Sequence, residues 1–398
     1  MATEVQGIAR ATPTETTAWW RDERKRGIVA QIVTILIVVG FFWFLISNML
    51  ENQRRLGVPL SLDFLEGTAG FQVSFSLIPI TLDSTILTVI KTGIVNTLLA
   101  SALSIVIATL LGFFVGVLRL STNWLIARIA TVYIEVVRNI PLLVQLLFWY
   151  IGITKMLPVV RQSIMIGPSI ALNVRGLFVP KPVPGEGSWI ILAALIVAVI
   201  GAVALHGWAK QRQMATGRQF PSIWSGVALV IVLPVVANLL AGSPVTWDPP
   251  VLKGFNFQGG LSLAPELVAL VMGLSVYTSA YIAEIVRGGI VAISHGQTEA
   301  ALALGLRPSW NLRLVVIPQA LRVITPPLTS QYLNILKNST LAGATGFPDL
   351  YAVIGTSQNQ TGRAVECVTI LMLFYLVVSL LISVFMNWYN KRIALVER

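Results

Sequence analysis

The stretch that decides the fold is Glu299-Ala-Ala-Leu-Ala-Leu-Gly305, a short run of helix-forming residues that ends in glycine. Ser294 and Gln297 precede it with the spacing of a capping box, in which each side chain bonds the other residue's backbone N–H. Gly305 suits the left-handed residue that follows a helix, and Pro308 cannot continue one. The sequence therefore predicts a separate helix of about ten residues, roughly 15 Å long, from Ser294 to Gly305.

This predicted helix has the composition of a docking element. Its small side chains, Ala300, Ala301 and Ala303, allow close approach to a groove on another protein. Glu299 and Arg307 can form charge-assisted hydrogen bonds at the rim of such a groove. The same residues would also suit an ordinary helix at a membrane interface, so the pattern alone leaves both interpretations open.

The composition of the whole chain is that of a membrane protein. Hydrophobic residues make up 55% of its 398 residues and charged residues 11%, against about 25% charged residues in soluble proteins. Crossing roughly 30 Å of hydrocarbon takes about 20 apolar residues. The stretches long enough to do so are 28–50, 91–118, 129–153, 189–208, 222–241, 263–286, 314–336 and 366–388. Pro318, Pro326 and Pro327 are expected to kink the seventh span.

The net charge of +11 raises the question of nucleic-acid binding. Most lysine and arginine residues, however, fall in the segments that share one side of the membrane with the N-terminus when the eight spans are counted. The positive-inside rule then predicts that both termini are cytoplasmic. The chain also lacks a stripe of aromatic and basic residues of the kind that stacks bases. We therefore interpret the charge as a sign of membrane topology and of attraction to anionic lipid.

The order of the spans predicts a core with additions. The first span is too long for the apolar region of a signal peptide and lacks a small-residue cleavage pattern, so we expect a retained anchor. This span and the pair within 189–241 are nearly uniform apolar helices, which favours peripheral positions facing lipid. The predicted organisation is a cytoplasmic segment 1–27, the anchor 28–50, a first core segment 91–153, periplasmic loops with two extra spans 154–262, a second core segment 263–388, and a cytoplasmic tail 389–398.

Several motifs of this core resemble those of one transporter family. Glu299–Gly305, with Pro318 thirteen residues after the glycine, resembles the cytoplasmic coupling motif of ABC importer permeases, E-A-A-x3-G-x9-I-x-L-P. Val137–Gln145 resembles the F-R-G-T-P-L-L-V-Q block of the polar amino-acid permeases, and Ala280–Ile290 their A-Y-x-A-E-I-x-R-G-G-I block. The resemblance continues at Pro318–Arg322 and Leu336–Leu341. In length and layout the chain is similar to the larger permease subunit of broad-specificity L-amino-acid or glutamate/glutamine importers of Gram-negative bacteria.

This resemblance implies an all-α membrane protein with a type I importer core of five helices and three peripheral helices. The residues it implies for coupling to an ATPase are Glu299, Ala300, Ala301, Gly305, Arg307 and Pro318. The chain has no G-x-x-x-x-G-K-[ST] phosphate loop, so we expect it to bind no cofactor and to leave ATP and Mg²⁺ to two partner ATPase subunits. Further expected partners are a second permease, taken to be a different chain, and a periplasmic amino-acid-binding protein. The chain would then be a permease of the bacterial inner membrane and not an enzyme.

The alternative is a secondary transporter or channel that works without an ATPase. Such a protein is expected to carry ionisable residues near the bilayer midplane. Glu135 and Glu284 instead fall towards the ends of predicted spans, and each has an arginine three residues on, Arg138 and Arg287, with the spacing of an ion pair. A membrane scaffold that transports nothing would explain the apolar spans but not the coupling motif.

Three side-chain amides share one face of the seventh predicted span, at i, i+3 and i+7. Amides donate and accept, so this face can bind the carboxylate and ammonium groups of an amino acid without adding a charge. Tyrosines four residues apart in the sixth span form the expected facing wall. The predicted substrate-binding residues are Gln331, Asn334, Asn338, Ser339, Thr340, Tyr277, Tyr281 and Ser275. The amides could instead only bridge helices.

The kind of substrate follows from the charge at this face. In the resembling family, permeases for cationic amino acids tend to carry acidic residues at the positions that match Gln331 and Asn338. Amides at both positions imply that arginine and lysine are not favoured and that neutral polar or acidic amino acids are accepted.

Asn139-Ile140 also departs from the family, which has Gly-Thr before the proline. No metal site is expected, since the two histidines are far apart and have no clustered carboxylates or thiols.

Overall fold

The computed structural model describes residues 23–393, apart from 56, 58–59 and 219. The predicted terminal segments 1–27 and 389–398 therefore lie partly outside the described residues. The chain divides into two units, Met1–Asp63 and Phe64–Arg398. The first unit contains α1 (Glu23–Arg55), a continuous helix that includes the predicted anchor 28–50.

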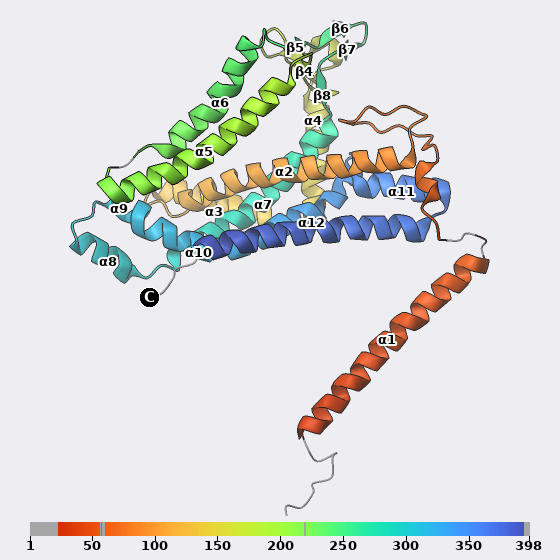
Figure 1. Ribbon diagram of the computed structural model, residues 1–398, viewed down its shortest axis with the longest axis horizontal. Coiled ribbons are helices and arrows are strands. Elements are labelled where there is room, and N and C mark those ends of the chain that lie inside the picture. The colour runs from red at the N-terminus through yellow and green to blue at the C-terminus, as the bar shows by residue number, and fades with distance from the viewer. Residues whose placement is uncertain (1–22, 56, 58–59, 219, 394–398) are drawn as a thin grey trace, which may run out of the picture. The chain divides into compact units, whose positions relative to one another are not determined.

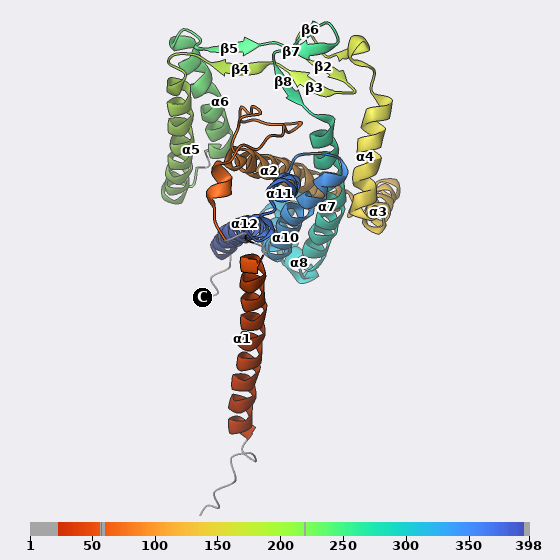
Figure 2. The same cartoon turned by 90° about the vertical axis from the view of Figure 1, so that its right-hand side faces the viewer.

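The second unit is organised around α7 (Pro265–Val291), as Figures 1 and 2 show. The helices that pack against α7 are α2 (Ile86–Leu118), α3 (Trp124–Asn139), α4 (Leu142–Met156) and α10 (Ile317–Asn338). The helix α11 (Leu350–Thr361) packs against α2 and α12 (Ala364–Ile393), and α12 also packs against α10. The short helical turns are η1 (Asp63–Glu66), η2 (Val160–Gln162) and η4 (Ser339–Ala344).

Close contact between α2 and α7 depends on glycine. A Cβ atom added at Gly112 would lie 2.6 Å from the Cβ of Ile282, and one at Gly116 would lie 2.7 Å from the carbonyl oxygen of Ala283. Because only hydrogen fits at these two positions, the two backbones approach closely, as is common between membrane helices. This contact packs α2 closely along α7.

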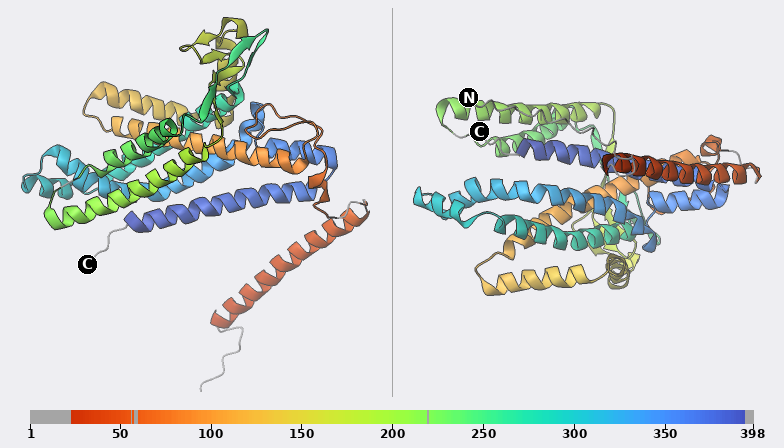
Figure 3. Two further views of the ribbon diagram at one scale, coloured as in Figure 1. Left: turned by 45° about the horizontal axis from the view of Figure 1, so that its top comes forward. Right: turned by 90° about the horizontal axis from the view of Figure 1, so that it is seen from below.

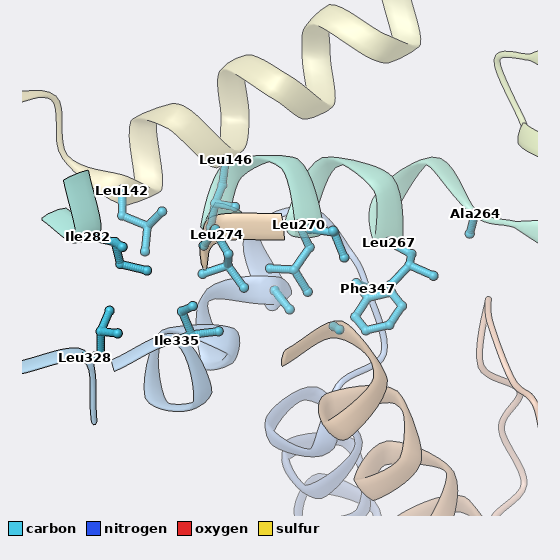
Figure 4. Close-up of a cluster of buried hydrophobic side chains, with 14 of the residues drawn as sticks. Leu142, Leu146, Ala264, Leu267, Leu270, Leu274, Ile282, Leu328, Ile335 and Phe347 are labelled. Atoms are coloured by element: carbon cyan, nitrogen blue, oxygen red, sulfur yellow. The ribbon is translucent and has the colours of Figure 1, made fainter. Parts of the chain in front are cut away.

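The apolar core fills the space between α7 and its neighbours. Figure 4 shows Leu142 and Leu146 of α4 directed at α7, and Leu270 and Leu274 of α7 within the same cluster. Ile335 of α10 completes this side of the cluster, and its side chain is fully buried. Burying one such side chain stabilises the fold by about 1.5–3 kcal/mol.

The span predicted over 129–153 is bent and not one straight helix. α3 and α4 are separate helices that meet at 104°. Proline disfavours helical geometry in the residue before it, and Ile140 accordingly has φ −95° and ψ 126°. The side chain of Gln145 donates to the carbonyls of Val137 and Ile140 at 2.8 and 3.0 Å, which satisfies acceptors left free where α3 ends.

The two connections predicted as periplasmic loops form a small β-module, visible above α4 in Figure 2. Its main sheet is antiparallel in the order β1-β2-β3-β8, and two separate ribbons pair β4 with β5 and β6 with β7. The strands are β1 (Ile164–Met165), β2 (Ala171–Asn173), β3 (Gly176–Val179), β4 (Lys181–Pro184), β5 (Val245–Asp248), β6 (Val251–Lys253), β7 (Asn256–Gln258) and β8 (Leu261–Leu263). Phe178 and Phe257, with ring centroids 5.0 Å apart, join the main sheet to a ribbon.

A helical hairpin is inserted in this module between β4 and β5. It consists of α5 (Trp189–Thr216) and α6 (Ser222–Leu240), which pack chiefly on each other (Figure 3, left). Gly226 of α6 lies against Ala202 of α5, and His206 Nδ1 bonds Ser222 Oγ at 3.1 Å. The large apolar side chains of both helices are mostly exposed. A lipid-facing position explains this exposure.

Eight helical segments thus lie where spans were predicted. Among the described residues, six helices are long and apolar enough to cross a membrane, and the bent pair α3 and α4 would make a seventh span. The eighth segment, α10, is continuous through Pro326 and Pro327 and is less apolar because it carries the predicted amide face.

Candidate functional site

The predicted helix between the sixth and seventh spans is present as α8 (His295–Ala303). It is followed by α9 (Pro308–Asn311) and a π-helical turn, η3 (Leu312–Val316), which leads into α10. Gly305 has φ +79°, as the sequence predicted. The N–H of Leu306 bonds the carbonyl of Ala301 at 3.1 Å, and that of Gly305 bonds Leu302 at 2.9 Å. This pair of bonds is a Schellman motif, which ends the helix and requires the left-handed residue.

The predicted capping box at the start of α8 does not form. The Ser294 side chain makes no capping hydrogen bond. The Gln297 side-chain oxygen instead accepts a hydrogen bond from Gln319 Nε2 of α10, at 3.3 Å. A bond to the neighbouring helix has therefore replaced the local one.

Most predicted coupling residues are accessible. Ala301 is buried at 4% exposure, while most other residues of α8 are exposed. Leu304 is 83% exposed, and Glu299 lies 3.9 Å from His295 in an exposed pair. The remaining predicted residues are Ala300, Gly305 and Arg307, all exposed, and Pro318, half-buried at the start of α10. The surface of α8 thus combines small, apolar and acidic side chains.

The second predicted site lies on the side of α7 that faces away from α2. Tyr277, Tyr281, Glu284 and Gly288 recur at three- and four-residue intervals, so they share one face of the helix. The contacts with α2 come from the opposite face, for example through Ile282. The hydroxyls of Tyr277 and Tyr281 lie 3.1 Å apart, and their ring centroids are 5.0 Å apart. We call this face, together with the adjoining amide face of α10, the open face.

The three amides of α10 share a face that adjoins α7. Leu328 and Ile335 of α10 pack into the core around α7. Gln331 and Asn338 fall beside these two in the helical repeat and are half-buried, while Asn334 is exposed. Within the described residues of the chain, none of the three amide side chains makes a hydrogen bond. Their donors and acceptors are therefore not used by contacts within the described part of this chain.

The hydroxyl residues predicted to join these amides lie elsewhere. Ser275 is buried against α2 and donates to the carbonyl of Ser104 at 3.4 Å. Ser339 is also buried and donates to the carbonyl of Leu336, while Thr340 donates to that of Lys337. The tyrosines and the amides, on two helices that pack on each other, therefore remain predicted substrate contacts, while both serines are buried in contacts within the chain.

An arginine cluster that the sequence reasoning missed borders the open face. Glu284 pairs with Arg287 at 2.7 Å, as predicted, and also with Arg119 from the end of α2. Arg138 does not pair with Glu135, contrary to the prediction. Its guanidinium lies over the ring of Tyr281, 5.1 Å from the centroid. The available signal was the unusual position of an arginine within a predicted span.

The chain is similar over nearly its whole length to known transport proteins. The chain is 48% identical over 392 residues to the general L-amino acid transport system permease protein AapQ of Rhizobium johnstonii, covering 97% of this chain and 98% of that protein. It is 47% identical over 375 residues to the putative amino-acid ABC transporter permease protein YhdX of Escherichia coli, covering 94% and 95%. It is 41% identical over 409 residues to the glutamate/glutamine/aspartate/asparagine transport system permease protein BztB of Rhodobacter capsulatus, covering 95% and 96%.

The family comparison covers most of the second unit. Residues 108–395 match the binding-protein-dependent transport system inner membrane component family. The match includes the bent pair, the inserted β-module and hairpin, α8 and the open face. The chain belongs to the family of binding-protein-dependent transport system inner membrane components.

Proposed function

We propose that the chain is the permease subunit of an ATP-driven ABC importer that moves L-amino acids across the bacterial inner membrane. The single observation that carries this is the exposed helix α8, ended by Gly305 and bonded to α10, in a chain without a phosphate-binding loop. The names of the three relatives supply the amino-acid substrate. ATP and Mg²⁺ then belong to the partner ATPase.

The exposed surface of α8 is the proposed contact with that ATPase. Leu304 would enter an apolar region of its groove, while Glu299 and Arg307 would bond polar groups at the rim. ATP binding would move α8 as a rigid element and so change which side of the membrane the open face is accessible from.

The open face is the proposed route and binding surface for the substrate. The amides Gln331, Asn334 and Asn338 would hold the ammonium and carboxylate groups of the amino acid. Tyr277 and Tyr281 would line the other wall. A second permease subunit, a different chain, would cover the part of this face that is exposed in this chain, for example at Asn334.

The proposed topology places α8 and both termini in the cytoplasm and the β-module in the periplasm. The positive-inside distribution of the sequence supports this assignment. The β-module would then lie on the side from which a periplasmic amino-acid-binding protein delivers substrate.

Reconstitution tests the proposed function directly. The chain, its partner permease and its ATPase are placed in proteoliposomes with an amino-acid-binding protein, and uptake of labelled glutamine is measured. Uptake that requires ATP hydrolysis and the binding protein is expected. Equal uptake by this chain without the ATPase would instead support a secondary transporter or channel.

A further inference from the structure

An apolar cavity lies where two helices meet the β-module. It has a volume of about 550 Å³ and is bounded by the second half of α4, the start of α7 and the strands β2 and β3. Leu172 and Leu177, which are opposite each other in the register of β2 and β3, line its sheet side. Phe148 and Ile153 of α4 and Met272 of α7 are among the side chains that line the rest. A cavity of this composition suits an apolar chain.

The cavity lies at the ends of two helices of the membrane part. α7 begins at Pro265, directly after β8, and α4 ends at Met156, shortly before the β-module begins (Figure 2). Both residues line the cavity. In the proposed topology these helix ends are on the periplasmic side, and Trp149, which also lines the cavity, is of a type enriched at membrane boundaries. The acyl chains of the nearer leaflet are therefore next to the cavity.

A second cavity, of about 330 Å³, adjoins the first and carries two arginines. Its lining residues are Val159, Val160, Arg161, Val174, Arg175 and Phe255. Two segments of the chain pass from one cavity to the other. Met156 and Leu157 line the apolar cavity, and Val159–Arg161 line the second; likewise Gly176 and Leu177 line the first, and Val174 and Arg175 line the second. An apolar site and a basic site are thus contiguous.

The buried side chain of Asn173 joins the two segments that carry the arginines. Its Oδ1 accepts a hydrogen bond from the N–H of Arg175 at 2.8 Å, and its Nδ2 donates to Ser163 Oγ at 3.0 Å. Ser163 is two residues after Arg161. These bonds hold the turn between β2 and β3 against the segment that follows α4, so both arginines belong to one ordered site.

Both guanidinium groups are available to an anion. Arg161 lies over the ring of Phe255, 4.5 Å from its centroid, and this stacking orients the guanidinium while its N–H groups remain free to bond. Arg161 and Arg175 are exposed, and within the described part of the chain neither forms an ion pair. Arginine binds phosphate oxygens with two parallel hydrogen bonds.

We propose that the two cavities form one binding site for an anionic phospholipid of the membrane. The phosphate bonds Arg161 and Arg175, and one acyl chain occupies the apolar cavity. A phospholipid matches both parts of the site, whereas free phosphate would leave the apolar part empty. A bound lipid would pack between α4, α7 and the β-module and so stabilise the attachment of the module to these two helices. The site is separate from the proposed substrate residues.

The test is photo-crosslinking of lipid to the complete importer in phosphatidylcholine nanodiscs. The probes are phosphatidylglycerol with a photoreactive acyl chain and phosphatidylcholine with the same chain, and the labelled peptides are identified by mass spectrometry. Phosphatidylglycerol should label segments 148–157 and 172–177 several fold more strongly than phosphatidylcholine. Equal labelling by both lipids, or labelling spread evenly over exposed helices such as α5 and α6, would overturn the proposal. Protection of the cavity by a partner subunit, seen as no labelling, would also overturn it.

Removing the two charges tests the phosphate contact. Arg161→Gln with Arg175→Gln should lower phosphatidylglycerol labelling of these segments about 5-fold for each arginine replaced, because a basic residue contributes about this factor to binding anionic lipid. The matched control replaces Lys181 and Lys253 with glutamine. Both are exposed basic residues of the β-module that line neither cavity, so the control should be labelled like the wild type.

Filling the cavity tests the acyl-chain contact. Gly152 lines the apolar cavity, and a Cβ atom added there would have no neighbour within 4 Å, so Gly152→Leu should occupy the cavity without a clash at Cβ and lower labelling by both lipids. Gly207→Leu in α5, at an equally open position, is the control. Unchanged phosphatidylglycerol labelling in both the double arginine variant and Gly152→Leu would refute the site. Labelling needs neither ATP nor amino acid, so a failure of the proposed transport function would be seen separately.

Discussion

Gln319 Nε2 donates a hydrogen bond to Gln297 Oε1 at 3.3 Å, and this bond joins α8 to the beginning of α10. Gln331, the first amide of the open face, lies twelve residues further along α10, about 18 Å away. α8 also follows directly on α7, which carries Tyr277 and Tyr281. A displacement of α8 is therefore transmitted to both helices that form the open face.

Replacing Gly305 with valine should uncouple transport. The residue has φ +79°, a conformation that costs an L-residue about 1–2 kcal/mol and a β-branched residue more. The space around it is open, so strain in the backbone and not a clash is the expected cause. Gly305→Val should reduce ATPase co-purification and uptake at unchanged membrane levels. Gly296→Val in the same helix, where φ is not positive and the nearest atom is 3.6 Å away, should be much milder.

The charge at Glu299 should matter for docking and not for folding. Its side chain is 77% exposed, and its only close charged neighbour among the described residues is His295 of the same helix. Glu299→Lys inverts the charge and should reduce ATPase binding and uptake at least several fold, while Glu299→Gln should be intermediate. Pull-down of the ATPase at matched permease levels measures the effect. Full uptake by both Glu299→Lys and Gly305→Val would argue against α8 as the coupling helix.

The proposed topology can be checked by cysteine labelling. The single native cysteine, Cys367, is buried, and a Cys367→Ser background removes it. Cysteines introduced within 208–220 or 292–310 should react only with membrane-permeant reagents in intact cells. Cysteines within 158–186 or 245–260, in the β-module and its connections, should react with impermeant ones. Labelling of position 295 from the periplasm would rule out a cytoplasmic α8.

Asp349 should make stability depend on pH. It is fully buried before α11, and burial raises the pKa of its carboxyl from 3.8 to about 7, although a hydrogen bond from the N–H of Ala352 opposes this. Between about pH 4 and 7 the folded state then keeps a proton that the unfolded state has lost, so stability falls as the pH rises through this window. Asp349→Asn keeps the acceptor and removes the titration. The variant should be roughly 1–3 kcal/mol more stable than the wild type at pH 8 and nearly equal at pH 4.

Thermal unfolding of the purified complex at several pH values measures this difference. Asp83→Asn, at an exposed site before α2, is the control and should follow the wild-type curve. A wild-type melting temperature that falls no more steeply with pH than that of Asp349→Asn would exclude this role for burial.

Features that depend on neighbouring residues could be predicted from the sequence, and those that depend on distant residues could not. The helix end at Gly305 and the amide face follow from local spacing. The bend at Pro141 was missed because an apolar run continues across it, and because Gln145, which bonds the freed carbonyls, looks like any polar residue in a helix. The β-module was missed because its strands have two to four residues, too few to show alternation.

The arginine cluster shows the same limit. Arg119 and Glu284 are 165 positions apart, and only the packing of α2 on α7 brings them together. For the same reason, the local spacing of Glu135 and Arg138 suggested an ion pair, while the structure places Arg138 over Tyr281 of another helix.

A carboxylate placed among the amides should change which amino acids are transported. Asn338 is half-buried on the open face, and its amide makes no hydrogen bond within the described residues. Asn338→Asp has the same shape and adds a negative charge, which should attract lysine and arginine and repel glutamate. We expect glutamate uptake to fall about tenfold relative to glutamine uptake, since a desolvated charge contact contributes about 1.4 kcal/mol or more. Uptake of arginine should rise.

The matched control is Asn123→Asp at the start of α3, where the side-chain oxygen accepts from the N–H groups of Leu125 and Ile126 in either form. It adds the same charge outside the open face and should leave the substrate preference unchanged. Gln331→Ala should slow uptake of every amino acid, because it removes a group that contacts the common backbone groups of the substrate. If the wild type prefers arginine to glutamine, or if Gln331→Ala and Asn338→Ala both leave the uptake kinetics unchanged, the substrate lies elsewhere.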